Sequence, residues 1–205
     1  MTAPSRVRDS TAALGVRAHS GWAAYVVLAG HPSAPDILAR GRMQLCDPAV
    51  AGSQQPFHWA EPMPLAAAQK YIARCTASSA KLAAKAVADL PCPVKACCVL
   101  TASGRALPNL KGILASHSYI HAAEGEFYRD AVDAACAATG VTVRRVRERD
   151  MEAELQNLPI SPAAAKEKLA EFGKKLGPPW TTDEKLSALG AWLMLAALPS
   201  RRALG

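Results

Sequence analysis

A chain of 205 residues can form one large domain or two small ones, and a hydrophobic content of 50% argues against wholesale disorder. The formal net charge of +7 is compatible with a nucleic acid, an acidic lipid surface or an acidic protein, and does not distinguish among these partners. Six cysteines without a CxxC pair indicate buried free thiols in a reducing cytosol rather than a disulfide-stabilised secreted domain.

Membrane insertion and export are not indicated. The basic residues near the N-terminus are not followed by a long apolar stretch, so they do not resemble a signal peptide. The longest apolar segment, residues 186–198, is too short to cross a bilayer and is typical of a buried helix. We therefore expect a cytoplasmic protein with no membrane partner.

The first part of the chain predicts three consecutive strands. Residues 1–10 are expected to form a disordered arm, and residues 11–200 a single domain. The segments "TAALGVRAH", "WAAYVVLAG" and "DILARGRMQL" have the apolar or alternating patterns of strands, and the short links between them favour an antiparallel meander. Residues 47–62 are expected to be a loop.

Helices and strands alternate after the meander. A helical pattern from Pro64 to about Leu90 precedes "CPVKACCVLTAS", which is typical of a buried central strand with Cys97 and Cys98 on opposite faces. A second helix is expected over residues 110–139, and "VTVRRVRE" then predicts a fifth strand.

Two helices are expected to close the chain. Ser161 as an N-cap and Pro162 at the first helical position predict a helix that ends near Gly177. The segment "TTDEKLSALGAWLMLAAL" predicts the last helix, because Thr181 and Glu184 have the spacing of a capping box.

This order of elements resembles the ribonuclease H-like superfamily, in particular Holliday-junction resolvases of the RuvC type. The opening "LGVRAHSGWAAYVVL" looks like the resolvase opening, in which a strand carries Gly-hydrophobic-Asp, turns at Gly/Ser and returns as a hydrophobic strand. The resemblance implies an α/β fold with a mixed five-stranded sheet, three antiparallel strands and then two parallel ones, flanked by helices. The patterns "RAHSGWAA", "SHxxIHxAEGExYR" and "PWxxDxK" also resemble a bacterial family, and this second resemblance implies no particular activity.

Nucleases of the superfamily hold two divalent metals, which implies carboxylates at three places in this chain. Two residues after Gly15 the chain has Arg17 instead of an acid, and the end of the fourth strand offers only Thr101 or Ser103. An acid, Asp183, does lie near the start of the closing helix, where helix capping alone also favours acids. Arg17 is expected to hold a phosphate or a carboxylate directly.

Four polar side chains recur along one face of the helix expected at residues 110–139. At about 100° per residue they fall in a narrow stripe, formed by His117, His121, Glu124 and Tyr128. Two histidines and a carboxylate at this spacing can bind a metal, act as an acid–base pair, or only hydrogen-bond to neighbouring elements. The predicted ligand set for a divalent metal, Mg or Mn, is His117, His121, Glu124 and Asp183.

A basic stripe lies on the first predicted helix. Its four members project within about 60° of one another, and they are Lys70, Arg74, Lys81 and Lys85. No acid occurs over residues 62–88 to pair with them, whereas a solvated helix face usually mixes both signs. The stripe predicts a face for the phosphate backbone of a nucleic acid, and a merely solvated face is the alternative.

Three other segments carry weaker signals. The run "RRVRER" at residues 144–149 adds positive charge near the fifth strand. His58 and Trp59, in the expected loop, can stack on a base or plug the core. Ser20 beside His19 is explained by turn chemistry, because adjacent side chains on an extended chain point in opposite directions.

Together these features predict first a divergent ribonuclease H-like protein associated with DNA or RNA. If it cleaves phosphodiesters by a metal-dependent reaction, Asp183 and Glu124 are the expected catalytic carboxylates. His117 or His121 is then the ligand or acid–base group, and Arg17 stabilises phosphate charge. The alternative is a non-catalytic binding or interaction module that keeps the fold. A third class is a small-molecule enzyme related to the actin-like kinases, although no clear glycine-rich phosphate loop supports it.

Overall fold

A computed structural model describes residues 11–102, 104 and 106–199. The arm expected at residues 1–10, the candidate Ser103 and the expected last domain residue, Ser200, lie outside the described residues.

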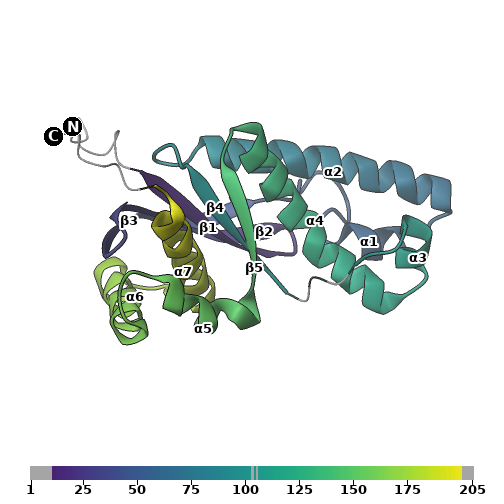
Figure 1. The fold of residues 1–205 in the computed structure, drawn as a ribbon. Coiled ribbons are helices and arrows are strands. Elements are labelled where there is room, and N and C mark those ends of the chain that lie inside the picture. The colour runs from purple at the N-terminus through teal and green to yellow at the C-terminus, as the bar shows by residue number, and fades with distance from the viewer. Residues whose placement is uncertain (1–10, 103, 105, 200–205) are drawn as a thin grey trace.

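Five strands form one mixed sheet in the order β3-β2-β1-β4-β5 (Figure 1). The strands are β1 (Ala12–His19), β2 (Trp22–His31), β3 (Ala34–Gln44), β4 (Ala96–Thr101) and β5 (Thr142–Arg147). β1, β2 and β3 form an antiparallel meander, whereas β4 runs parallel to β1 and β5 runs parallel to β4. This order and these directions are those of the ribonuclease H-like fold, so the predicted fold class is confirmed.

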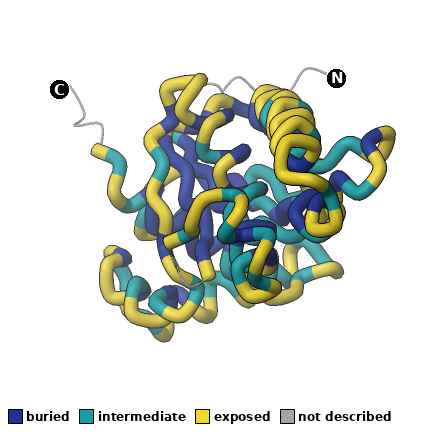
Figure 2. Tube along the Cα trace, turned by 90° about the vertical axis from the view of Figure 1, so that its right-hand side faces the viewer, coloured by how far each residue is buried: buried dark blue, intermediate teal, exposed yellow. Residues whose placement is uncertain are grey.

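Helices cover both faces of the sheet. They are α1 (Pro56–Ala60), α2 (Leu65–Ala88), α3 (Leu110–Leu114), α4 (His117–Ala138), α5 (Met151–Glu154), α6 (Pro162–Leu176) and α7 (Thr182–Ala197). α2 and α4 lie on one face and α7 on the other, and α1 and α3 lie beyond the sheet against one end of α4 (Figure 1). Buried positions concentrate in the middle of the molecule, and the outer segments are exposed (Figure 2).

Alternation along the strands separates the core into two halves. Leu14 and Cys97 pack with α2 and α4, whereas Ala13 and Cys98 pack with α7. The expected placement of the two adjacent cysteines on opposite faces of β4 is therefore confirmed, and all six positions of β4 are buried. The thiols are free, and Cys46 alone among them is only partly buried.

A glycine in β1 allows α7 to lie directly on the sheet. A Cβ atom at Gly15 would come within 1.8 Å of the Ser187 carbonyl oxygen and 2.6 Å of the Ala191 backbone nitrogen. Any larger residue would therefore force the strand and the helix apart. The start of α7 is fixed locally by the predicted capping box, in which Glu184 accepts a hydrogen bond from the Thr181 backbone N–H at 2.7 Å.

The structure differs from the sequence-based prediction in two places. The expected loop at residues 47–62 contains the short helix α1, in which Pro56 occupies the first turn and the Phe57 side chain is buried. The expected helix at 110–139 is interrupted, because Ser116 has an extended backbone (φ −146°, ψ 114°) and serves as the N-cap position of α4. The break lets Ile113 of α3 and Ile120 of α4 pack into one small core with Phe57.

Among the described residues, no helix has the length and apolar character needed to cross a membrane. The longest apolar segment, residues 186–198, instead lies mostly in the buried helix α7.

Candidate functional site

The packing of α7 on β1 brings Arg17 to Asp183. Gly15 and Arg17 point to the same face of the sheet, because they are two residues apart on a strand. Two strand residues span about 6.6 Å and four helical residues about 6 Å. Since Gly15 lies against Ser187, Arg17 meets the residue four positions earlier in α7, which is Asp183.

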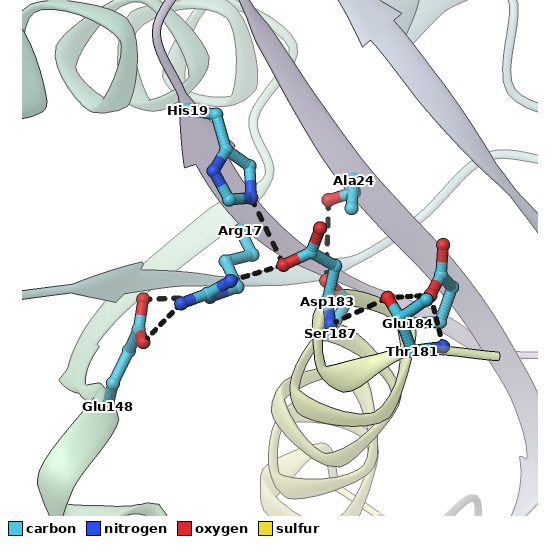
Figure 3. Close-up of polar contacts among 8 residues, drawn as sticks. All are labelled: Arg17, His19, Ala24, Glu148, Thr181, Asp183, Glu184 and Ser187. Atoms are coloured by element: carbon cyan, nitrogen blue, oxygen red, sulfur yellow. Dashed lines mark hydrogen bonds and ion pairs between the residues drawn. The ribbon is translucent and has the colours of Figure 1, made fainter. Parts of the chain in front are cut away.

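The Arg17 guanidinium binds two carboxylates at once (Figure 3). Its Nε donates to Glu148 Oε1 at 2.9 Å and its Nη2 donates to Glu148 Oε2 at 2.8 Å. Its Nη1 donates to Asp183 Oδ1, and His19 Nε2 lies 3.1 Å from the same oxygen. Glu148 directly follows β5, so the Arg17 side chain reaches across the end of β4 to make this pair.

Arg17 stabilises the charged form of Asp183 at this sheet edge. Burial raises the pKa of Asp183, but the hydrogen bond from Arg17 and the charges of His19 and Arg17 outweigh it, so the pKa lies below its usual value. The pKa of Arg17 is raised, chiefly by its hydrogen bonds to Glu148.

This donor set does not fit the pair of divalent metals that superfamily nucleases use. A guanidinium stands between the two carboxylates where metal cations would have to lie. Thr101, at the end of β4, is buried and offers a hydroxyl instead of a carboxylate. Glu184 is held by the capping box, where the Thr181 hydroxyl also donates to it at 2.6 Å. We therefore derive no metal-dependent step at this edge.

A second polar cluster lies at the start of α4. His117 and His121, from the predicted stripe, have their Nε2 atoms 3.0 Å apart and are both exposed. The His58 ring, from α1, lies edge-on to both, with ring centroids 5.5 Å from His117 and 4.8 Å from His121. One nitrogen from each ring lies within 4.8 Å of the others, so these three residues are close enough together to share a metal ion.

Glu124 connects α4 to α1 behind the three histidines. Its Oε1 accepts hydrogen bonds from the backbone N–H groups of Phe57 (2.8 Å) and His58 (3.0 Å), and lies 3.2 Å from His58 Nδ1. It therefore caps α1 from another helix, since Gln55 at the N-cap position makes no side-chain cap. Burial raises the pKa of Glu124, although these hydrogen bonds oppose the shift.

The predicted stripe thus divides along its length. Its first two members are exposed and its last two are buried. Tyr128, the last, donates a hydrogen bond to the Ser53 carbonyl. Gly125, next to Glu124, gives space to the Arg129 side chain, whose Nη1 would lie 2.9 Å from an added Cβ. The stripe therefore lines a helix–helix junction at one end and reaches solvent at the other.

The predicted ligand set is not brought together as one group. His117 and His121 lie together, whereas Glu124 contacts α1 and Asp183 contacts Arg17. Sequence reasoning missed Glu148 as a member of a site, and considered His58 only for stacking on a base or plugging the core. Glu148 follows a basic strand without any motif. The sequence held one indication that His58 lies on a helix, because proline is favoured in the first helical turn and Pro56 occupies that position.

The four members of the basic stripe are all exposed on α2, namely Lys70, Arg74, Lys81 and Lys85. Lys85 pairs with Asp89, in the turn after the helix. Among the described residues, Lys70, Arg74 and Lys81 have no ion-pair partner. Three cations on this face are thus available to an external anion.

The other basic segment, residues 144–149, is not a free positive patch. Arg145 binds three acids of α4, which are Glu126, Asp130 and Asp133. The three other arginines of the segment also pair with acids. Arg144 pairs with Glu154, and both Arg147 and Arg149 pair with Asp150. The expected addition of positive charge at this strand is therefore wrong, because the acids of α4 and of the following turns neutralise it.

The sequence matches no family model and no curated protein. Among solved structures, Thermus thermophilus RuvC in complex with a Holliday junction substrate is similar to this chain with a TM-score of 0.49 and 13% identity, over 89% of this chain and 91% of that one. A second structure of Thermus thermophilus RuvC is similar with a TM-score of 0.46 and 13% identity, over 89% of this chain and 92% of that one.

Proposed function

We propose that this chain is a nucleic-acid-binding protein that uses the outer face of α2 and does not hydrolyse phosphodiesters at its sheet edge. The observation that carries the proposal is the row of exposed cations on α2, three of which have no acidic partner among the described residues.

The length of this row suits a phosphate backbone. Lys70 and Lys85 are fifteen residues apart, so the row spans about 22 Å at 1.5 Å per helical residue. Over that span a duplex presents many phosphates, since it carries one negative charge per about 1.7 Å of axis. The row therefore meets several phosphates without needing to recognise particular bases.

The sheet edge does not support a competing hydrolytic function. The Arg17 guanidinium is already engaged by Glu148 and Asp183, so it is not free to bind a phosphate. Two metal ions at this edge would have to displace Arg17 from both carboxylates. This reasoning favours the binding module over a metal-dependent phosphodiesterase.

Fluorescence anisotropy with labelled duplex DNA, a four-way DNA junction, single-stranded DNA and RNA tests the proposal. We expect affinity to fall with salt, with a log–log slope of about −3 if three cations each release counterions at a duplex. Lys70→Glu with Lys81→Glu should weaken binding and flatten this slope. Lys174→Glu with Lys175→Glu, an equal change in charge at two exposed positions of α6, is the matched control and should do so much less.

Binding that is undetectable at low salt, or that is weakened equally by Lys174→Glu with Lys175→Glu, refutes the use of α2. The same substrates incubated with Mg²⁺ or Mn²⁺ test catalysis. Metal-dependent cleavage that Asp183→Asn abolishes would show that the chain is a nuclease and not a binding module alone.

A further inference from the structure

We propose that His58, His117 and His121 together bind one transition-metal ion of the zinc class. Glu124 is the carboxylate that orients the His58 ring toward that ion. This inference does not depend on nucleic-acid binding, because it concerns a different part of the molecule from the α2 row.

Three imidazoles from two helices converge here, and that convergence is the first argument. His117 and His121 lie one turn apart on α4, so a single ion can reach both. His58 comes from α1, more than fifty residues earlier in the chain, and its ring packs against both of theirs. A helix-surface pair of histidines alone would be ordinary, whereas a third imidazole from another element forms a site.

The second argument is the orientation of His58. Glu124 Oε1 lies 3.2 Å from Nδ1, and this contact favours the tautomer that carries its proton on Nδ1 and leaves the Nε2 lone pair free. Glu124 itself is fixed by the two backbone N–H groups at the start of α1. A carboxylate behind a ligating histidine is the usual arrangement that sets the ring and its tautomer in protein metal sites.

The third argument is the spacing of the donor atoms. Zinc–nitrogen bonds of 2.0–2.1 Å at tetrahedral angles place two nitrogens about 3.3 Å apart. The His117 and His121 Nε2 atoms are 3.0 Å apart, and the three nitrogens lie within 4.8 Å of one another. The upper limit of 4.8 Å exceeds the ideal separation by about 1.5 Å, which rotation of the exposed His117 and His121 side chains can close.

The donor type selects the class of metal. Imidazole nitrogen suits Zn, Cu, Ni and Fe, whereas Mg and Mn prefer carboxylate and carbonyl oxygen. Three protein ligands leave a fourth position for water, as in zinc sites that are open to a small molecule. That position is accessible, because His117 and His121 are exposed and His58 also lines a surface hollow of about 610 Å³.

The test uses the full chain, stripped of metal with a chelator and titrated with Zn²⁺ by calorimetry and with Co²⁺ by visible absorption. We expect one ion per chain and the intense absorption of tetrahedral Co²⁺. His117→Ala with His121→Ala should abolish both signals while the far-ultraviolet circular dichroism stays unchanged, since both side chains are exposed. Glu124→Gln should weaken binding by about 10- to 100-fold and leave the stoichiometry at one.

Two controls separate this site from other donors. His31→Ala removes an exposed histidine elsewhere on the chain and should leave the affinity unchanged. Cys46→Ser removes the one thiol that is only partly buried, and should also have no effect. The proposal is overturned by the absence of stoichiometric binding, by binding that survives the double histidine variant, or by binding that Cys46→Ser removes.

Discussion

Replacing Gly15 with alanine should be the most damaging single-methyl change in the sheet. The added Cβ would lie 1.8 Å from the Ser187 carbonyl oxygen, and ordinary contact begins at 3.4 Å. The strand and α7 would have to separate by about 1.6 Å, and both clashing atoms belong to the main chain, so no side chain can simply turn away. Overpacking of a core costs about 1–3 kcal/mol, and we expect the upper end, about 3 kcal/mol.

Urea unfolding monitored by circular dichroism measures this loss, as a lower midpoint at an unchanged slope. Gly125→Ala is the comparison, because the atom that its Cβ meets is a side-chain nitrogen, Arg129 Nη1 at 2.9 Å, and not the main chain. Arg129 is buried and is held by hydrogen bonds to the Leu100 carbonyl and to Glu126, so moving it has a cost, which a gain of about 1 kcal/mol of helix propensity offsets. Gly125→Ala should therefore lower the free energy of unfolding much less than Gly15→Ala does.

Gly15→Ala should also uncouple Arg17 from Asp183, because Asp183 lies one helical turn before Ser187, where the added Cβ clashes. Arg17→Ala should therefore cost less in the Gly15→Ala background than in the wild type, which a double-mutant cycle measures. If Gly15→Ala unfolds at the wild-type urea concentration, α7 does not approach β1 as closely as this reasoning requires.

Three further predictions concern the polar contacts. Asp183 and Glu184 have lowered pKa values in the folded state, so their contribution to stability is full above their unfolded pKa values near 4 and is lost as the pH falls through their folded-state pKa values. The difference in the free energy of unfolding between wild type and Asp183→Asn, measured with urea, should therefore shrink below about pH 4. A difference that stays constant with pH would contradict this. Tyr128→Phe leaves the buried Ser53 carbonyl without its donor and should cost about 1–3 kcal/mol in thermal or urea unfolding; no loss would mean that water replaces the hydroxyl. Arg17→Asp places a third carboxylate beside Glu148 and Asp183 and removes the cation between them, so Mg²⁺ should raise the melting temperature of this variant and not that of the wild type. An equal response of both proteins would refute the interpretation that Arg17 takes the place of the metal.

Elements whose pattern is local can be predicted from the sequence. The strands of the meander follow from apolar alternation, and the start of α7 follows from the capping pair Thr181 and Glu184. The opposite orientation of Cys97 and Cys98 follows from the two-residue period of a strand. Each of these features depends on residues within a few positions of one another.

Features that depend on distant partners could not be predicted in this way. α1 has only five residues, and its first N–H groups are capped by Glu124, which is more than sixty residues away. The break at Ser116 depends on packing of α3 against α4 and α1, and not on a helix-breaking residue. Arg145 looks like part of a positive run until its three acids on α4 are known.

The two polar clusters differ in what their donor atoms already bind. At the sheet edge, Asp183 and Glu148 have the strongest partner available in a protein, a guanidinium, and any cation must compete with it. At the start of α4, the His117 and His121 Nε2 atoms lie 3.0 Å apart, and both rings lie edge-on to the His58 ring. Neutral imidazoles repel an approaching cation far less than Arg17 does, and their lone pairs bind it directly. The predicted stripe of α4 therefore keeps its potential as a metal site, with His58 as the third ligand and Glu124 behind it.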